Sequence, residues 1–182
     1  RVIDYKSGAR KFDPTLVYWG LQLQLLLYLA AALSRVPGSH AAGFFYCRIA
    51  DPTVKTESRI REEVEKQIAK KLSLQGISLS DVAILRAQGG SVASMVTKDG
   101  KPNGRYAASM VDEAGMEKLL DFAKRKAAEL AGEIYRGEMD DSPVERGAFN
   151  ACQNCEYSAI CAFDPMRKPR RRLTAKKLDD LL

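Results

Sequence analysis

The chain opens with Arg1-Val2-Ile3-Asp4-Tyr5-Lys6-Ser7-Gly8, and this stretch decides how the rest is interpreted. β-Branched apolar residues run into a carboxylate and a Ser-Gly break follows, which predicts a strand and its end. Residues i and i+2 of a strand point to the same side, so Asp4 and Lys6 should project together, with Tyr5 on the opposite face. A carboxylate can hold a divalent cation, and a lysine can orient water and offset charge on a phosphate. The pair therefore suits phosphodiester cleavage, although the tripeptide alone also fits an ordinary surface strand end.

A long helix is expected after this strand, from about residue 15 to residue 34. Asp13 can cap it, Pro14 suits its first position, and Pro37-Gly38 follows its end. Its apolar face is expected to comprise Leu16, Trp19, Leu23, Leu26, Leu27 and Ala30. Gln24 and Tyr28 are four residues apart and therefore share a face. They either lie at the core edge with backbone partners, or face the Asp4/Lys6 pair and contact substrate.

The middle of the chain alternates between strand and helix patterns, which predicts an α/β sheet covered by helices. A strand rich in aromatic residues is expected at 43–50, an exposed amphipathic helix at 55–72, and a short helix at 81–87 capped by Ser80. Short strands are expected at 91–96 and 106–111, around a turn-forming segment. A second long helix is expected at 111–136, capped by Asp112 and ended by Gly137, with a short extended segment beyond residue 140.

Three cysteines near the end of the chain, Cys152, Cys155 and Cys161, have the spacing C-x2-C-x5-C. In a chain without a secretory signal, this pattern favours metal ligands over disulfide partners. Three thiolates are one short of a tetrahedral zinc site or a [4Fe–4S] cluster. Cys47 and His40 are candidates for the fourth ligand, but a cysteine in an aromatic strand usually serves as a small apolar residue. A cysteine upstream of the first residue is the favoured fourth ligand.

The composition predicts one globular domain. The chain has 182 residues, of which 46% are hydrophobic and 29% charged. No apolar run is long enough to span a membrane and no secretory signal is present, so a cytoplasmic location is expected. The chain does not begin with Met and opens inside a strand, so we expect a fragment of a longer protein, cut just before its catalytic strand.

The net charge of +6 is concentrated in a tail at residues 166–182. Seven basic residues supply it: Arg167, Lys168, Arg170, Arg171, Arg172, Lys176 and Lys177. Without them, basic and acidic residues nearly balance. Such a tail either contacts nucleic acid or is a solvated extension.

The motifs occur in an order that resembles the RecB-type nuclease domain, a branch of the PD-(D/E)xK superfamily. Asp4-x-Lys6 comes first, Gln24-x-x-x-Tyr28 follows, and the three cysteines close the series. The sequences of residues 2–8, 18–29 and 45–52 look like the C-terminal nuclease domains of the AddB subunits of AddAB-type helicase–nucleases. The resemblance covers residues 1–165 as a partial nuclease domain and leaves the tail at 166–182 outside. It implies a restriction-endonuclease-like sheet flanked by helices, truncated at the N-terminus, with a C-terminal cysteine-rich loop.

The resemblance also implies a role for each motif. Asp4 would bind Mg²⁺, with the Tyr5 carbonyl as a further ligand, and Lys6 would be the catalytic lysine. Gln24 and Tyr28 would support the site and contact the DNA strand. Cys152, Cys155 and Cys161 would hold a [4Fe–4S] cluster together with an upstream cysteine. The second metal-binding carboxylate would also lie upstream, and this chain lacks both upstream ligands.

The expected function is that of a Mg²⁺-dependent DNA exonuclease domain of a helicase–nuclease. It would process double-strand breaks for recombinational repair and cut a single strand as it emerges from the motor, beside an AddA-type helicase–nuclease subunit. No Walker A sequence is present, so no ATP binding is expected. One alternative is a non-catalytic DNA-binding or subunit-contact module in which Asp4 and Lys6 form only a surface ion pair. Another is an interaction domain stapled by zinc, in which Cys47 joins the three clustered cysteines.

Overall fold

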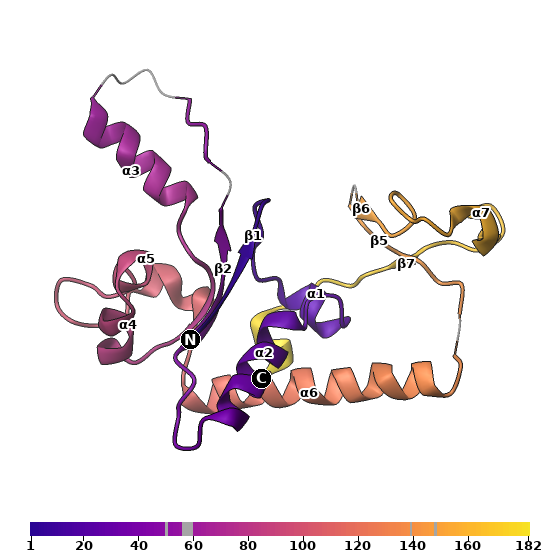
Figure 1. The fold of residues 1–182 in the computed structure, drawn as a ribbon, viewed down its shortest axis with the longest axis horizontal. Coiled ribbons are helices and arrows are strands. Elements are labelled where there is room, and N and C mark those ends of the chain that lie inside the picture. The colour runs from indigo at the N-terminus through magenta and orange to yellow at the C-terminus, as the bar shows by residue number, and fades with distance from the viewer. Residues whose placement is uncertain (50, 56–59, 139, 148) are drawn as a thin grey trace.

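A computed structural model describes residues 1–49, 51–55, 60–138, 140–147 and 149–182 (Figure 1). The strands are β1 (Val2–Lys6), β2 (Gly43–Arg48), β3 (Gln75–Leu79), β4 (Met110–Val111), β5 (Val144–Arg146), β6 (Phe149–Asn150) and β7 (Arg171–Arg172). The α-helices are α1 (Pro14–Tyr18), α2 (Gln24–Arg35), α3 (Arg61–Lys71), α4 (Val82–Gln88), α5 (Gly90–Ala93), α6 (Glu113–Tyr135) and α7 (Ser158–Cys161). Two short 3-10 helices are η1 (Gly104–Ser109) and η2 (Leu178–Leu181).

The main sheet is mixed, with the strand order β1-β2-β3-β4. Strands β1 and β2 are parallel, β3 runs antiparallel to β2, and β4 is parallel to β3. Asp4 lies opposite Tyr46 and Lys6 lies opposite Arg48 in the β1–β2 register. Register partners on neighbouring strands point to the same face of a sheet, so these four side chains share one face.

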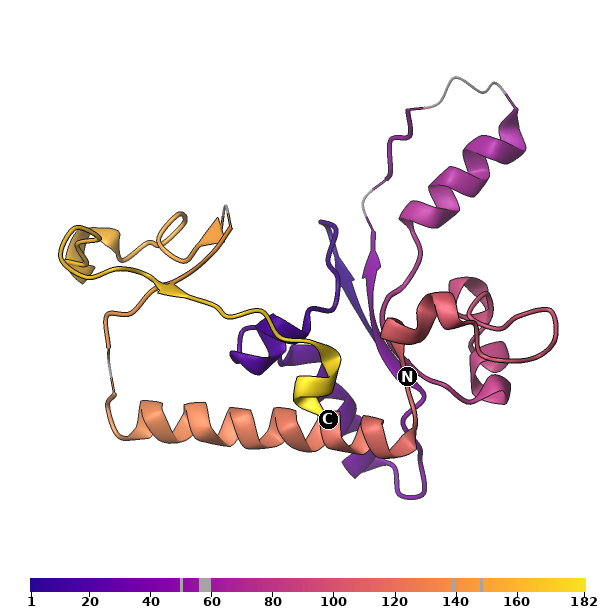
Figure 2. The same cartoon turned by 180° about the vertical axis from the view of Figure 1, so that it is seen from behind.

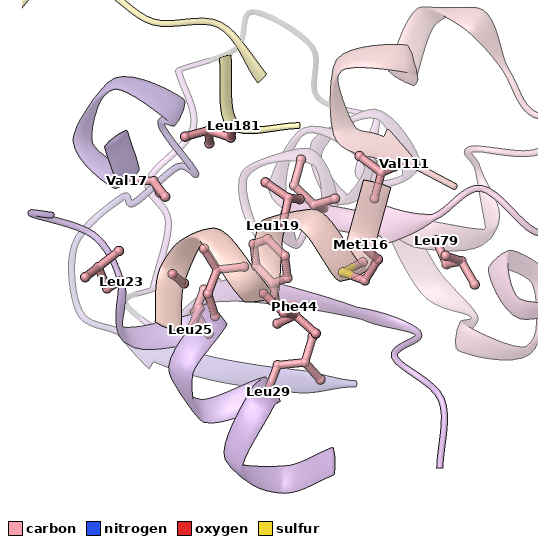
Figure 3. Close-up of a cluster of buried hydrophobic side chains, with 14 of the residues drawn as sticks. Val17, Leu23, Leu25, Leu29, Phe44, Leu79, Val111, Met116, Leu119 and Leu181 are labelled. Carbon is pink, nitrogen blue, oxygen red and sulfur yellow. The ribbon is translucent and has the colours of Figure 1, made fainter. Parts of the chain in front are cut away.

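Helices cover both faces of this sheet, as the α/β pattern predicts. On one face, Phe44 packs with Leu25 of α2 and Leu119 of α6 in the main hydrophobic core, which Figure 3 shows. On the other face, Phe45 packs with Leu85 of α4. Consecutive phenylalanines of β2 therefore serve opposite cores, as strand alternation requires. None of the described helices is both long enough and apolar enough to cross a membrane.

The long helix expected at residues 15–34 is divided into two helices, so that prediction was wrong in its continuity. Helix α1 ends at Tyr18 and α2 begins at Gln24. Gly20 lies between them with φ of +79°, a left-handed conformation that interrupts a right-handed helix. A Cβ atom at Gly20 would lie 2.7 Å from Leu130 Cδ1 of α6, so the break also allows a close approach of the two segments. The division makes Gln24 the first residue of α2.

The region between β2 and α6 differs most from the prediction. The short strands expected at 91–96 and 106–111 are mostly helical, as α5 and η1; the extended parts described there are β4 and an isolated β-bridge between Val96 and Pro102. Strand β3 was not predicted, because Gln75-Gly76-Ile77-Ser78-Leu79 is short and contains a glycine. That glycine is required by the sheet, since a Cβ atom at Gly76 would lie 2.0 Å from the Phe44 carbonyl oxygen.

Several boundaries are close to those predicted. Helix α6 begins after Asp112, whose carboxylate accepts a hydrogen bond from Gly115 N, and it is followed by Gly137 with a positive φ. Helix α4 is capped by Asp81 rather than by Ser80. Helix α3 has no buried residue, as its sparse apolar pattern predicts. The predicted start of this helix and the last residue of the strand at 43–50 fall partly on residues 56–59 and 50, which lie outside the described residues.

The C-terminal part forms a separate small sheet, β6-β5-β7, which Figures 1 and 2 show away from the main sheet, on the side of the C-terminal half of α6. The tail then returns to the main core, where Leu181 is buried (Figure 3). The tail is held beside α1, because Lys176 N donates to Thr15 Oγ1 at 3.0 Å and Trp19 Nε1 donates to the Thr174 carbonyl at 3.2 Å. A fully solvated extension therefore does not describe this tail.

Candidate active site

Asp4 and Lys6 project together from the end of β1. Lys6 Nζ lies 2.8 Å from Asp4 Oδ2, and the Lys6 and Asp4 side chains are only 30% and 15% exposed, respectively. Tyr5, between them, lies on the other face and is 62% exposed. Strand alternation alone therefore accounts for the close pairing of carboxylate and ammonium groups.

Gln24 and Tyr28 extend this pair along α2. Lys6 Nζ donates to Gln24 Oε1 at 3.2 Å, and Gln24 Nε2 donates to Tyr28 Oη at 2.9 Å. The two residues share a helix face because they are four positions apart. Of the two placements considered from the sequence, the structure has the one that faces the Asp4/Lys6 pair. Four side chains named from the sequence thus form one connected polar series, from Asp4 to Tyr28.

A pocket of about 280 Å³ opens beside this series. Besides Lys6 and Gln24, it is lined by Arg10, Tyr46 and residues 20–23. The sequence interpretation missed Arg10 and Tyr46 as neighbours of the site. The aromatic strand at 43–50 contained Tyr46, but only the β1–β2 register places it opposite Asp4.

Tyr46 is a buried phenol next to a carboxylate. Burial raises the pKa of Tyr46 above its usual value of 10.0, and the Asp4 carboxylate raises it further. Arg10 and a hydrogen bond with Gln22 act in the opposite direction on this pKa. Tyr46 is therefore kept neutral at physiological pH, and its hydroxyl is polar without adding negative charge beside Asp4.

Gln22 fixes the segment that carries Arg10. The Gln22 side chain is buried, its Oε1 accepts from Asp13 N, and its Nε2 donates to the Lys11 carbonyl, both at 2.8 Å. Both bonds hold the turn that leads from β1 into α1. The same turn is fixed by Asp13, whose carboxylate accepts from Thr15 N at 2.9 Å. The position of Arg10 over the pocket thus follows from a buried amide just before α2.

The Asp4 carboxylate is suited to bind a cation, but a metal site needs further ligands beside it. Asp4 Oδ2 is buried, and apart from its ion pair with Lys6 it makes no hydrogen bond in the described part of the chain. A carboxylate oxygen in that state suits a divalent cation. Within the same described ranges, however, no group of three or more His, Cys, Asp or Glu side chains is arranged to hold a metal ion. The described residues therefore supply one part of a metal site rather than a whole ligand set.

The cysteines do not form a metal centre in this structure. Cys152, Cys155 and Cys161 are free thiols on successive turns between β6 and the end of α7, and Cys161 is exposed. Cys155 N donates to the Cys152 carbonyl at 3.4 Å, and Cys161 N donates to the Tyr157 carbonyl at 2.9 Å. Cys47 lies opposite Tyr5 in the register, on the sheet face away from Asp4. In the described part of the chain, these cysteines are not gathered into a group that could hold a metal ion.

A mixed α/β sheet that brings a carboxylate and a lysine together at the end of a strand has the groups that suit phosphodiester cleavage. Comparison of the chain with protein families agrees with that chemistry, because the PD-(D/E)XK nuclease superfamily matches residues 1–162. The chain belongs to the PD-(D/E)XK nuclease superfamily, which confirms the family resemblance and the α/β fold predicted from the sequence.

Curated relatives carry a more particular name. The chain is similar to the B subunit of an ATP-dependent helicase/deoxyribonuclease from Alkaliphilus metalliredigens, with 37% identity over 90% of the chain and 15% of the relative. It is similar to a protein of the same name from Desulforudis audaxviator, with 36% identity over 100% of the chain and 17% of the relative. It is also similar to one from Clostridium kluyveri, with 34% identity over 99% of the chain and 17% of the relative. The chain thus spans 15–17% of the length of these relatives.

Proposed function

We propose that this chain is the nuclease domain of a helicase–nuclease, a Mg²⁺-dependent DNA exonuclease that processes double-strand breaks for recombinational repair in the cytoplasm. The observation that carries the proposal is the connected series Asp4–Lys6–Gln24–Tyr28 at the end of β1. Membership of a nuclease superfamily and similarity to proteins named as part of a helicase/deoxyribonuclease support it.

The lysine is the central group of the proposed mechanism. An ammonium group has three N–H donors. Lys6 directs one toward Asp4 and one toward Gln24, and the third is free to contact the attacking water or a phosphate oxygen. Asp4 and Gln24 therefore hold the charge of Lys6 in place before a strand arrives, which is the preorganisation that stabilises developing charge. Tyr28 fixes the Gln24 amide through its hydroxyl oxygen.

The metal belongs to the proposal. A divalent cation bound through Asp4 and the Tyr5 carbonyl would act as a Lewis acid on the phosphate and favour deprotonation of water. Among the described residues Asp4 is the single carboxylate at this place, so the proposal includes a second carboxylate from elsewhere in the full-length protein.

We further propose that the substrate is a single DNA strand delivered by a helicase, and that an AddA-type protein is the partner. A third part of the proposal is a [4Fe–4S] cluster that uses Cys152, Cys155 and Cys161. The cluster rests on the C-x2-C-x5-C spacing and on the family resemblance. Metal analysis of the full-length protein, purified without oxygen, tests it. About four irons per protein support the cluster, whereas zinc in place of iron rejects it.

A second candidate function is a non-catalytic DNA-binding or subunit-contact module. The observation that favours it is the lack of a complete metal-binding group in the described ranges of the chain. In that case Asp4 and Lys6 would form only a structural ion pair, whose exchange for neutral residues would leave cleavage unchanged.

The Asp4→Ala substitution in the full-length protein, studied with its partner, separates the two candidates. Each DNA strand is labelled separately, because the proposed partner also cleaves DNA. Loss of cleavage of one strand with ATP-driven unwinding retained is the expected result. Asp99→Ala is the matched control, since Asp99 is exposed and lines neither the site nor its pocket. Unchanged cleavage by Asp4→Ala rejects the nuclease proposal, and unchanged cleavage with weaker DNA binding supports the second candidate.

A further inference from the structure

A second pocket, of about 330 Å³, adjoins the pocket at Lys6 and Gln24. Arg10 and Tyr46 line both, so the two pockets lie next to each other along these side chains. The second pocket is also lined by Ala9, Lys11, Arg48, Lys70, Lys71, Ser73 and Gln75. We call these two adjoining pockets together the basic track. Neither pocket has an Asp or a Glu in its lining.

The basic track draws its cations from three separate parts of the chain. Arg10 and Lys11 follow β1, Arg48 ends β2, and Lys70 and Lys71 end α3. Arg48 lies beside Lys6 in the β1–β2 register. In the adjoining β2–β3 register, Tyr46 lies beside Gln75. The positive groups therefore follow the end of the sheet away from the Lys6 site, toward the C-terminal end of α3.

The described residues offer these cations no acidic partner. None of Arg10, Lys11, Arg48, Lys70 and Lys71 takes part in an ion pair within the described ranges. Lys71 Nζ is engaged by the Thr53 carbonyl, a local structural contact. Arg48 differs, because its Nε is buried and has no hydrogen-bond partner in that same described part. Buried donors are normally satisfied, so an unpaired one at the wall of a pocket is available to an acceptor that enters the pocket.

The helix dipole explains only part of this arrangement. Lysines in the last turn of a helix interact favourably with its free carbonyls, which accounts for Lys70 and Lys71 in α3. It does not account for Arg10 or Arg48, which lie on a loop and a strand. Cations drawn from three segments, with no carboxylate in the lining of either pocket, suit a chain of several phosphates better than a single small anion.

We propose that the basic track binds the phosphodiester backbone of the nucleic-acid strand that leads into the Asp4/Lys6 site, with Arg10, Arg48 and Lys70 as phosphate contacts. This inference rests on the proposed nuclease function and adds the path of the substrate to it. The only aromatic side chain that lines the track, Tyr46, is buried, so the contacts are to the backbone and independent of base sequence.

The test variant is Arg10→Gln/Arg48→Gln/Lys70→Gln, which removes three charges and retains polar side chains of similar length. Cleavage of a labelled oligothymidylate by the full-length protein is measured without ATP, so that the motor does not deliver the strand. Each lost phosphate contact lowers the dependence of log(kcat/KM) on log salt by about 0.7 for a single strand, so the slope should fall by about 2. The same relation predicts a loss in kcat/KM of about 100-fold at 0.1 M salt, with kcat at saturating DNA nearly unchanged.

The control variant is Arg105→Gln/Lys118→Gln/Arg125→Gln. These residues carry the same total charge as the three residues of the test variant, are exposed, and do not line the basic track. The control should retain the salt slope of the unmodified protein. An equal loss of slope in both variants would mean that total charge, rather than the basic track, binds the strand, and would overturn the proposal.

Photocrosslinking separates this inference from the proposed function. An oligothymidylate that contains 4-thiothymidine is bound to the full-length protein, and the adducts are mapped by mass spectrometry. Adducts within residues 9–11 and 70–75 that are lost in the triple variant support the basic track, even if Asp4→Ala leaves cleavage unchanged. Adducts only elsewhere, together with an unchanged salt slope, overturn it, even if cleavage depends on Asp4.

Discussion

The link between Lys6 and Gln24 gives a sharp prediction, because one amide joins the ammonium group to Tyr28. The Gln24→Ala substitution removes the 3.2 Å hydrogen bond to Lys6 and the 2.9 Å bond to Tyr28. A hydrogen bond to a charged group contributes about 1.5–3 kcal/mol, and the length of this bond and the exposure of Gln24 reduce that to about 1 kcal/mol. If this hydrogen bond stabilises the transition state by the same amount, about 1 kcal/mol, through the position of Lys6, its loss should lower kcat about fivefold and leave KM nearly unchanged.

The assay is single-turnover cleavage of a labelled strand by the full-length protein. The Tyr28→Phe substitution keeps the bond between Lys6 and Gln24 and should reduce the rate less, by about twofold. Gln67→Ala is the matched control, because Gln67 lies on the exposed helix α3, away from the site. Full activity of Gln24→Ala, or a loss that appears only in KM, would refute the conclusion that Gln24 positions the lysine.

Two further predictions concern stability. The pKa of Tyr46 is raised in the folded protein, so the phenol stays neutral there at pH values at which the unfolded chain begins to ionise. The contribution of Tyr46 to the free energy of unfolding is therefore full below about pH 10, and it falls as the pH rises through the higher folded pKa. Tyr46→Phe should flatten that fall in denaturant unfolding measured between about pH 9 and pH 11, and an unchanged profile would show that Tyr46 is not its source. Leu181→Ala should lower the free energy of unfolding by about 2–3 kcal/mol, because Leu181 is 4% exposed in the main core. Leu182→Ala, at a residue 38% exposed, should cost less than about 1 kcal/mol, and equal small effects at both positions would contradict a docked tail.

The candidate site could be predicted from the sequence to the extent that it depends on local geometry. Asp4 and Lys6 are placed by the period of a strand, and Gln24 and Tyr28 by the period of a helix. Neither requires knowledge of distant contacts. Arg10 and Tyr46 could not be placed in this way, because their position beside Lys6 depends on the β1–β2 register and on the buried amide of Gln22.

The errors in the fold have the same origin. The prediction of a continuous helix passes through Gly20, because a single glycine costs a helix only about 1 kcal/mol. The close approach of Leu130 to Gly20 comes from a residue far away in the sequence, which the local pattern does not contain. Strand β3 was overlooked because Gly76 weakens its pattern, although the sheet needs a glycine at this point. The tail carried a strong charge signal that obscured Leu178 and Leu181, which pack against the main core.

The most direct test of the proposed function is the rate of strand cleavage after the Lys6→Ala substitution, at saturating DNA and in a single turnover. Loss of a group that stabilises the transition state should reduce this rate by about 10²–10³-fold. DNA unwinding should be retained, and Lys118→Ala, at an exposed lysine of α6, should cleave at the normal rate. A Lys6→Ala protein that cleaves within about twofold of the normal rate would contradict the assignment of this site as a nuclease active site.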